Sequence, residues 1–326
     1  MTQGRLNKLQ ILTKGEAPSR AQRVLHTDDI LFQCVRPYQK NNYIVNDVLS
    51  DIQWVASTGY AQIRTEIDYP TFLYYVLNTP KYNKAVIVRC TGSSYPAINS
   101  EDLSKIPFYK CGIAEQKKIA SLLSLLDARI ATQSKAIEDL KKLKSAISER
   151  LFKNIKGDVI TLAEICDIVK GKQINGELLS EHGKYYVMNG GTEPSGYYDN
   201  YNVEADTISI SEGGNSCGYV QFNKYPFWSG GHCYSIQNIA ENVDNLYLYH
   251  YLKSKEDAIM KLRIGSGLPN IQKKDLAMFK IQLPARNQQE TISNSLSLLE
   301  QKVENEVRIQ NAMLKEKQYL LRQMFI

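Results

Sequence analysis

The feature that most constrains this chain of 326 residues is an internal duplication. The segment GSSYPAINSEDLSKIPF (92–108) aligns without gaps with GSGLPNIQKKDLAMFKI (265–281), an offset of 173 residues. The same offset pairs Gln116 with Gln289 and Leu151-Phe152 with Met324-Phe325. A match at one fixed offset predicts one structural unit built twice. The length allows about two domains, because compact domains usually contain ~100–200 residues.

Upstream of this match the two copies diverge but keep the same outline. Three pairs of segments correspond: Asp28–Phe32 with Ala205–Ile210, Ala56–Arg64 with Trp228–Ile236, and Thr71–Pro80 with Asn245–Ser254. The last pair is amphipathic and predicts a helix in each copy. Each unit therefore has a variable half followed by a constant half.

The constant half predicts a long helix in each copy, because apolar residues recur at spacings of three and four. The first stripe is Ile119, Leu122, Leu126, Ile130, Ile137, Leu140, Ile147 and Leu151. The second is Ile292, Leu296, Leu299, Val303, Met313, Leu320 and Met324. Forty helical residues make a rod of roughly 60 Å. We expect the two rods to pair as an antiparallel coiled coil, which hides both stripes; the alternative is two separate helices, each lying on its own domain.

The variable halves predict mixed α/β domains. In the second copy, short runs rich in β-branched residues (206–211, 219–222 and 233–236) alternate with glycine-rich turn clusters. The predicted fold class is α+β, with two α/β domains containing mixed sheets, each followed by a long helix. The predicted domains are 1–106 (variable), 107–155 (long helix), 156–283 (variable) and 284–326 (long helix).

No catalytic constellation is evident. The segment KGKQING (170–176) lacks the spacing of a phosphate-binding loop, and there is no Asn-Pro-Pro-aromatic motif. The four histidines are scattered: His26, His182, His232 and His250. His232 beside Cys233 could be half of a metal or Cys–His site, although a packed histidine beside a strand cysteine is commoner. Asp28-Asp29 is expected to cap or solvate a strand start. We therefore predict a non-catalytic chain without a metal or a cofactor of its own.

Net charge and cysteine content constrain the possible partners, metal sites and compartment only weakly. The net charge of +6 is compatible with an anionic partner but does not require one. None of the six cysteines forms a C-x-x-C pair, so neither a zinc ribbon nor a redox pair is indicated. The N-terminal sequence lacks the apolar core of a signal peptide, and no stretch approaches ~20 apolar residues. The sequence predicts free thiols in a reducing cytoplasm.

The remaining polar and aromatic residues are suited to reading DNA. Asn and Gln can pair with adenine, Arg and Lys with guanine, and amides and hydroxyls with phosphates. The candidate contacts are Arg36, Gln39, Lys40, Arg64, Lys172, Gln173, Tyr197, Tyr198, Asn200, Tyr201, Asn215, Ser216, Gln221, Lys224, Ser266 and Asn270. The alternative is that these Asn- and Gly-rich loops serve turn geometry alone.

The chain resembles the specificity subunits of type I restriction–modification systems. The resemblance rests on Ile106–Ile130, which is similar to the family's entry into its central helix, and on GSSYPAI and GSGLPNI at the ends of the variable domains. Thr161–Gln173 resembles the opening of a recognition domain, and Tyr185–Asn202 resembles a common second-domain loop. The resemblance covers nearly the whole chain.

This resemblance implies that each variable domain is a target-recognition domain for one half of a split DNA site, while the helices set the spacing. It also implies docking of two adenine-N6 methyltransferase subunits and the joining of motor–nuclease restriction subunits. S-adenosylmethionine, ATP and Mg²⁺ would then belong to those partners. A rod of ~60 Å exceeds one turn of B-DNA, ~34 Å, so two readers could occupy successive turns.

Two departures from the family pattern stand out. Lys110-Cys111 replaces the usual Pro-Pro before the first helix. The first copy also has no recognised counterpart of TLAEICDIVKGKQ (161–173), so we expect its recognition domain to be truncated. Such a chain could be a fragment, a misassigned start or a silent recombination cassette for recognition domains.

Two other functions remain open on the sequence alone. A coiled-coil scaffold with protein-binding domains would show no DNA affinity that falls steeply with salt. An enzyme with its site in the glycine-rich loops would lose turnover when Asn215 and His232 are replaced.

Overall fold

The computed structural model describes the chain except residues 1–5, 7–9, 14, 47–51, 266, 268 and 326. It divides into two compact units. Unit 1 contains residues 1–135 and 308–326, and unit 2 contains residues 136–307. The division falls within both long helices, α4 (Ile113–Lys153) and α8 (Arg286–Gln323), so each unit holds part of each helix.

Unit 1 contains two small antiparallel sheets and three short helices. Strand β2 lies between β3 and β5, and β1 pairs with β4. The strands are β1 (Ala21–Val24), β2 (Ile30–Gln33), β3 (Tyr43–Ile44), β4 (Val55–Ser57) and β5 (Tyr60–Ile63). The helices are α1 (Pro70–Leu77), α2 (Pro80–Val88) and α3 (Ser100–Ser104), with a 3-10 turn, η1, at Pro37–Gln39.

Unit 2 is larger and builds on a four-stranded antiparallel sheet, β11-β10-β13-β7. Two further sheets are β12-β8-β9 and β14-β6. The strands are β6 (Asp158–Thr161), β7 (Asp167–Lys170), β8 (Tyr185–Met188), β9 (Tyr197–Tyr198), β10 (Thr207–Ser211), β11 (Val220–Asn223), β12 (Trp228–Ser229), β13 (Cys233–Gln237) and β14 (Lys280–Leu283). The helices are α5 (Asn245–Ser254), α6 (Glu256–Met260) and α7 (Lys273–Ala277), with 3-10 turns η2 (Leu162–Glu164) and η3 (Gly176–Leu178).

The two units share one plan, which confirms the mixed α/β prediction. The central strand β2 of unit 1 pairs with β3 and β5, and the central strand β10 of unit 2 pairs with β11 and β13. Helices α1 and α5 each follow the last of these strands. Unit 2 adds β7 beside β13, whereas the described residues of unit 1 place no strand beside the outer edge of β5.

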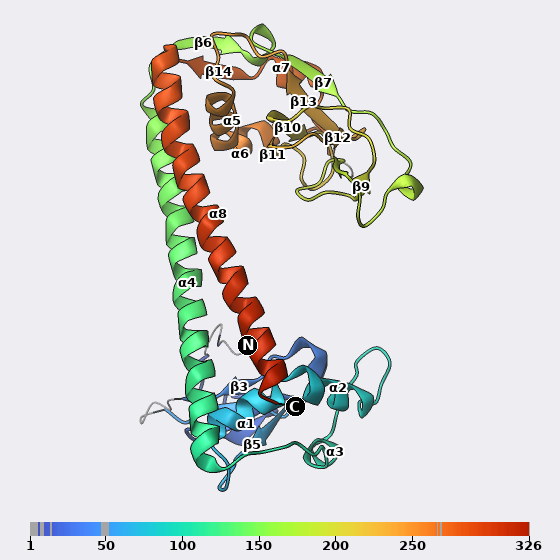
Figure 1. Ribbon diagram of the computed structural model, residues 1–326, viewed down its shortest axis with the longest axis vertical. Coiled ribbons are helices and arrows are strands. Elements are labelled where there is room, and N and C mark those ends of the chain that lie inside the picture. Colours follow the sequence, from blue (N-terminus) through green and yellow to red (C-terminus); the bar gives the residue numbers. More distant parts are fainter. Residues whose placement is uncertain are drawn as a thin grey trace. The chain divides into compact units, whose positions relative to one another are not determined.

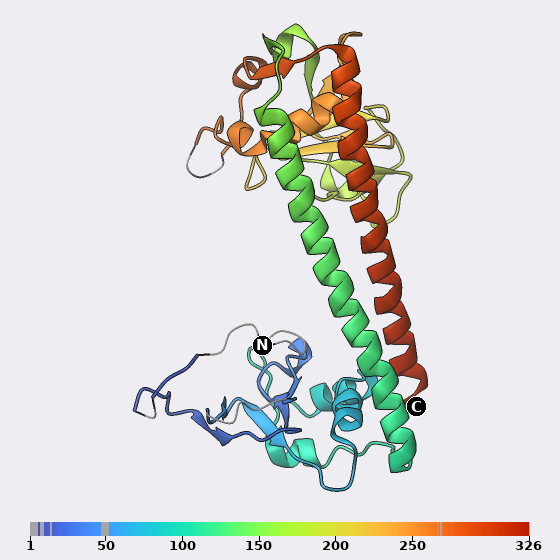
Figure 2. The ribbon, with the colours of Figure 1, turned by 90° about the vertical axis from the view of Figure 1, so that its left-hand side faces the viewer.

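The long helices run antiparallel and side by side within each unit, as predicted (Figures 1 and 2). Side-chain pairs that join them include Asp127 with Lys317 and Ser134 with Gln310 in unit 1, and Lys144 with Glu300 in unit 2. The offset of 173 converts the Asp127–Lys317 ion pair into the Lys144–Glu300 ion pair. Each unit therefore contains an equivalent ion pair between the two helices.

The predicted heptad is confirmed, but its phase in the first copy is wrong near the helix start. Leu122 is 46% exposed, whereas Leu123 is fully buried. Ala120 packs into the apolar core of unit 1, Leu123 and Ile130 are also buried, and the polar Asp127 bonds to Lys317 in the seam between α4 and α8. Polar residues in a seam cost stability but fix the register of the pair.

A buried glutamine at the start of each long helix ties it to its domain. In unit 2, Gln289 Oε1 accepts the N–H of Asp244, the N-cap of α5, at 2.7 Å, and its Nε2 donates to the carbonyl of Pro284 at 2.9 Å. In unit 1, Gln116 likewise accepts from Tyr69, the N-cap of α1, and donates to the carbonyl of Cys111. The repeated glutamine therefore connects the start of each long helix to the N-cap residue of α1 or α5, and we call it the glutamine lock.

Aromatic packing anchors the helix ends. Phe152, near the end of α4, packs edge-on against Tyr251 at 5.3 Å in unit 2. Phe325, just after α8, packs against Phe72 at 5.4 Å in unit 1. In the described residues, no helix has both the length and the apolar character needed to cross a membrane.

Candidate nucleic-acid interface

Glycine-rich loops of unit 2 converge on one another. The Asn189 side chain accepts the N–H of His232 at 3.1 Å, and Ser211 Oγ donates to the carbonyl of Gly190 at 2.6 Å. The N–H of Gly214 donates to the carbonyl of Pro269, which brings a fourth loop to the same place. Gly230 must lack a side chain, because a Cβ there would lie 2.5 Å from the Asn189 amide oxygen. The strand ends thus present a cluster of turns, which we call the loop cluster (residues 171–173, 189–191, 212–216, 229–232, 264–265, 267 and 269–270).

A buried carboxylate organises the base of the loop cluster. Glu212 Oε1 accepts from Lys170 Nζ at 2.6 Å and from the Tyr234 hydroxyl at 3.2 Å. Its Oε2 is buried without a hydrogen bond among the described residues, and His232 Nδ1 lies 3.8 Å away. Burial, followed by the charge of Glu212, raises the pKa of Tyr234, so this phenol stays a donor. Lys170, Glu212 and His232 are not among the DNA contacts predicted from the sequence, because the burial of a Glu before Gly-Gly leaves no sequence signal.

The structure brings several predicted DNA contacts together in the loop cluster. Lys172, Gln173 and Asn215 are exposed, and Ser216 is half-buried. Asn270 forms a bridge with Gly213. Ser266 lies outside the described residues. The Lys172 carbonyl accepts from the Trp228 indole at 3.0 Å, and Tyr198 packs edge-on against that indole at 5.2 Å.

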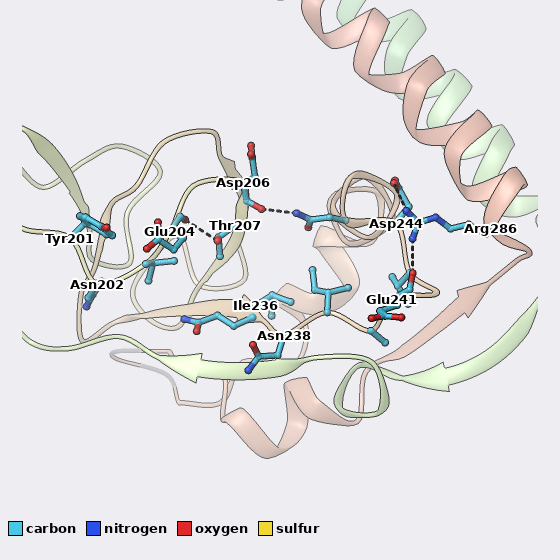
Figure 3. A pocket seen from close by; sticks show the side chains of 16 residues that line it. Tyr201, Asn202, Glu204, Asp206, Thr207, Ile236, Asn238, Glu241, Asp244 and Arg286 are labelled. Atoms are coloured by element: carbon cyan, nitrogen blue, oxygen red, sulfur yellow. Dashed lines mark hydrogen bonds and ion pairs between the residues drawn. The ribbon is translucent and has the colours of Figure 1, made fainter.

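The other predicted residues of the tyrosine loop lie apart from this group. Tyr197 belongs to β9, Asn200 is exposed, and Tyr201 packs on Tyr185 at 4.9 Å. Tyr201 also lines a cavity of about 900 Å³ (Figure 3). That cavity carries four carboxylates and one guanidinium: Glu204, Asp206, Glu241, Asp244 and Arg286. Its acidic lining opposes DNA phosphates, so the cavity is not part of the candidate interface.

Gln221 and Lys224 lie on or just after β11, away from the loop cluster. Lys224 Nζ forms an ion pair with Glu304 of α8 at 3.1 Å. The amide oxygen of Gln221 is buried without a hydrogen bond among the described residues. The Lys224 ammonium is therefore already paired within unit 2. The Lys172 ammonium, in contrast, has no partner among the described residues.

Unit 1 repeats the backbone frame of the loop cluster. The N–H of Arg36 donates to the carbonyl of Pro96, as that of Gly214 does to Pro269. Arg36 has a φ of 54° and Gly214 a φ of 77°, so both are left-handed. The Arg36 guanidinium lies 4.3 Å from the centre of the Tyr95 ring. Arginine thus stands where unit 2 has glycine, and it places a stacked cation at the loop tip.

The two neighbouring candidates follow Arg36 in the η1 turn. Gln39 is exposed, and its Oε1 accepts from Gln33 at 2.9 Å. Lys40 caps the turn with a φ of 53°. These residues share one loop with Arg36 and form the candidate interface of unit 1.

Arg64 occupies a different environment. Its guanidinium donates to both carboxylate oxygens of Asp29, at 2.7 and 2.8 Å. Asp29 is fully buried, so the expectation that it caps or solvates a strand start is wrong. Burial alone would raise the pKa of Asp29, but hydrogen bonds from Arg64, the His26 N–H and Gln62 hold that pKa below its ordinary value. Arg64 is therefore committed to a buried ion pair.

The Cys–His alternative finds no geometric support. Cys233 is buried, and burial raises the pKa of its thiol to about 11, whereas the His232 side chain is 62% exposed and faces Glu212. Burial also lowers the pKa of His250 to about 4, as expected for a core histidine. Across the described ranges, no group of three or more His, Cys, Asp or Glu could hold a metal.

Replacing Lys172 with alanine is expected to reduce the slope of log affinity against log salt by about 1, because one phosphate contact is lost. The matched control is Lys224→Ala, which removes the same charge from a side chain paired with Glu304. Fluorescence anisotropy with a DNA duplex over a KCl series measures both slopes. Equal changes for the two variants would contradict placement of the interface at the loop cluster.

Replacing Arg36 with glycine is expected to weaken DNA binding while changing the stability of unit 1 by less than about 1 kcal/mol, because relief of the left-handed strain is offset by the entropy of glycine and the loss of the Tyr95 contact. Glycine adopts the left-handed backbone without the penalty of ~1–2 kcal/mol that other residues pay. Thermal unfolding and DNA anisotropy measure the two effects separately. Unchanged DNA affinity would remove Arg36 from the interface.

Sequence comparison assigns the chain to a family. The family model of the type I restriction–modification DNA specificity domain matches residues 2–142 and 154–315. These two matches cover most of the chain, which therefore belongs to this family.

The relatives are specificity subunits. A putative type I specificity subunit of Mycoplasma genitalium is 33% identical over 158 residues, which are 48% of this chain and 41% of that protein. A putative type I restriction enzyme specificity subunit of Methanocaldococcus jannaschii is 26% identical over 272 residues, 72% of this chain and 62% of that protein. The chain thus spans about two fifths to three fifths of the length of these relatives.

Solved structures share the fold. The crystal structure of a type I S subunit from M. genitalium superposes with a TM-score of 0.69 at 20% identity, over 92% of this chain and 83% of that chain. A chain from a study of complex assembly and conformational transition in a type I system gives a TM-score of 0.59 at 22% identity, over 94% of this chain and 84% of that chain. The predicted α+β architecture with paired long helices is confirmed.

Proposed function

We propose that this chain is a DNA-reading specificity subunit of a type I restriction–modification complex, in which each unit reads one half of a bipartite target. The observation that carries the proposal is the repeated loop frame, with Arg36 and Gly214 in equivalent left-handed positions against Pro96 and Pro269. A frame that is constant while its exposed side chains differ suits two readers of different half-sites.

In this proposal the chain itself is not catalytic. Two methyltransferase subunits dock on the helical regions, and restriction subunits join them for cleavage. S-adenosylmethionine, ATP and Mg²⁺ are then bound by those partners. The fixed register of α4 and α8, set by pairs such as Asp127–Lys317, suits a spacer that determines the gap between half-sites.

The test is a long-read map of N6-methyladenine after co-expression of the chain with the methyltransferase subunit encoded beside it. A split motif, two short half-sites with a fixed gap, is the expected result. Methylation governed by one half-site would restrict reading to unit 2. No methylation, with that methyltransferase active beside an intact specificity subunit, would overturn the proposal and favour a scaffold or a silent cassette.

A further inference from the structure

Unit 1 contains an apolar groove that the proposed function does not use. Its volume is about 470 Å³, and it lies between helices α1 and α2 and the segment that precedes α4. The apolar lining comprises Val76, Tyr82, Ala85, Ile106, Pro107, Phe108, Tyr109 and Phe325. Lys81 and Arg89 also line it, and none of the lining residues is acidic.

Unit 2 shows what covers the equivalent segment there. Residues 279–283 of unit 2 correspond to 106–110 of unit 1 at the offset of 173. In unit 2 this segment forms β14 and pairs with β6, so that Ile281 lies opposite Ile160. Just beyond, Leu162 donates its N–H to the carbonyl of Phe279 at 2.9 Å, and its side chain is fully buried.

Within the described part of unit 1, the corresponding edge is open. Among the described residues, nothing forms a backbone hydrogen bond with residues 107–110. Phe108 stands where Ile281 stands, and Ile106 stands where Phe279 stands. Residues opposite each other in an antiparallel pair share one face. A strand added here would therefore place the equivalents of Ile160 and Leu162 beside Phe108 and Ile106, which line the groove.

Charge also favours a segment like the one that unit 2 uses. The segment GDVITLAEI (157–165) carries Asp158 and Glu164 and no basic residue. The groove presents only positive charges, at Lys81 and Arg89. An acidic strand with apolar residues at alternate positions therefore matches both the shape and the charge of the groove.

We propose that this groove is a docking site for an extended acidic–apolar segment of a partner polypeptide, which adds a strand along residues 107–110 as β6 does along β14. Backbone hydrogen bonds give such strand addition its affinity, and pockets for alternate side chains give it specificity. This inference is independent of DNA reading.

The test uses the full chain and a fluorescent peptide, GDVITLAEI, blocked at both ends. Saturable binding by anisotropy is expected, at a dissociation constant on the order of 100 μM or tighter. N-methylation at Ile160 should weaken binding about tenfold or more, because that N–H points to the paired strand. N-methylation at Val159 is the matched control, since the N–H of the neighbouring residue points away and binding should persist.

A charge-reversal variant tests whether the basic residues of the groove contribute to peptide binding. Arg89→Glu should weaken peptide binding without unfolding unit 1, as followed by circular dichroism, because the Arg89 side chain is exposed and donates to the local Ala85 carbonyl. If both N-methyl peptides lose the same binding affinity, or if neither loses any, strand addition would be overturned. Absence of binding at millimolar peptide would also overturn the proposal. Self-association of the chain that blocks the peptide would make a second copy the occupant and overturn the assignment to a partner.

Discussion

Arg64→Ala is expected to lower the free energy of unfolding of unit 1 by about 2–3 kcal/mol. The substitution leaves the fully buried Asp29 carboxylate without its bidentate partner, and removal of one member of a buried pair costs ~3–5 kcal/mol. The lower figure applies because the Arg64 side chain is 52% exposed and solvent screens part of the interaction. The chain has two tryptophans, Trp54 in unit 1 and Trp228 in unit 2. Urea unfolding followed by Trp54 in a Trp228→Phe background reports on unit 1.

The same substitution has a pH signature. The pKa of Asp29 is lowered in the folded state, so its stabilising contribution is present above the unfolded value of ~3.9 and is lost as the pH falls through the folded value. Without Arg64, burial raises that pKa. The stability gap between wild type and variant should therefore narrow as the pH falls, first as Asp29 of the variant is protonated and then as Asp29 of the wild type is protonated at its lowered folded pKa. Arg64→Lys is the control, because lysine keeps the positive charge but cannot make the two parallel hydrogen bonds that the guanidinium donates to Asp29. A loss of DNA affinity without loss of stability would instead make Arg64 a DNA contact.

Gln289→Ala is expected to lower the free energy of unfolding of unit 2 by about 3 kcal/mol. The side chain is 1% exposed and bonds to the N–H of Asp244 and to the carbonyls of Asn242 and Pro284. Each buried polar group left without a partner costs ~1–3 kcal/mol, and partial rearrangement reduces the sum. Urea unfolding followed by Trp228 in a Trp54→Phe background measures the effect.

Two comparisons make this result specific. Gln288→Ala removes the same side chain from the exposed neighbouring position, and its effect should stay within about 0.5 kcal/mol. Gln116→Ala removes the equivalent lock from unit 1, so Trp54 should report it. If Gln289→Ala matches Gln288→Ala, water replaces the amide and the lock adds no stability.

The candidate site was only partly predictable. Arg36, Lys172, Gln173 and Asn215 could be proposed because exposed loop residues of these types suit base and phosphate contacts. Gln221, Lys224 and Tyr201 have the same chemistry, yet tertiary packing places them on a strand edge or in an acidic cavity. Glu212 gave no sequence signal, because its role depends on Lys170 and Tyr234, which are distant along the chain.

The sequence by itself determined the duplication, the helical periodicity and the mixed α/β class, because these depend on spacing along the chain, which local geometry converts directly into structure. Tertiary structure alone decided which face of α4 is buried, so that Leu123 rather than Leu122 is buried. It also decided that Asp29 is buried and held by Arg64, and that none of the described residues pairs with 107–110 as β6 pairs with β14. These features depend on contacts between residues far apart in the chain, whose pairing no local pattern specifies.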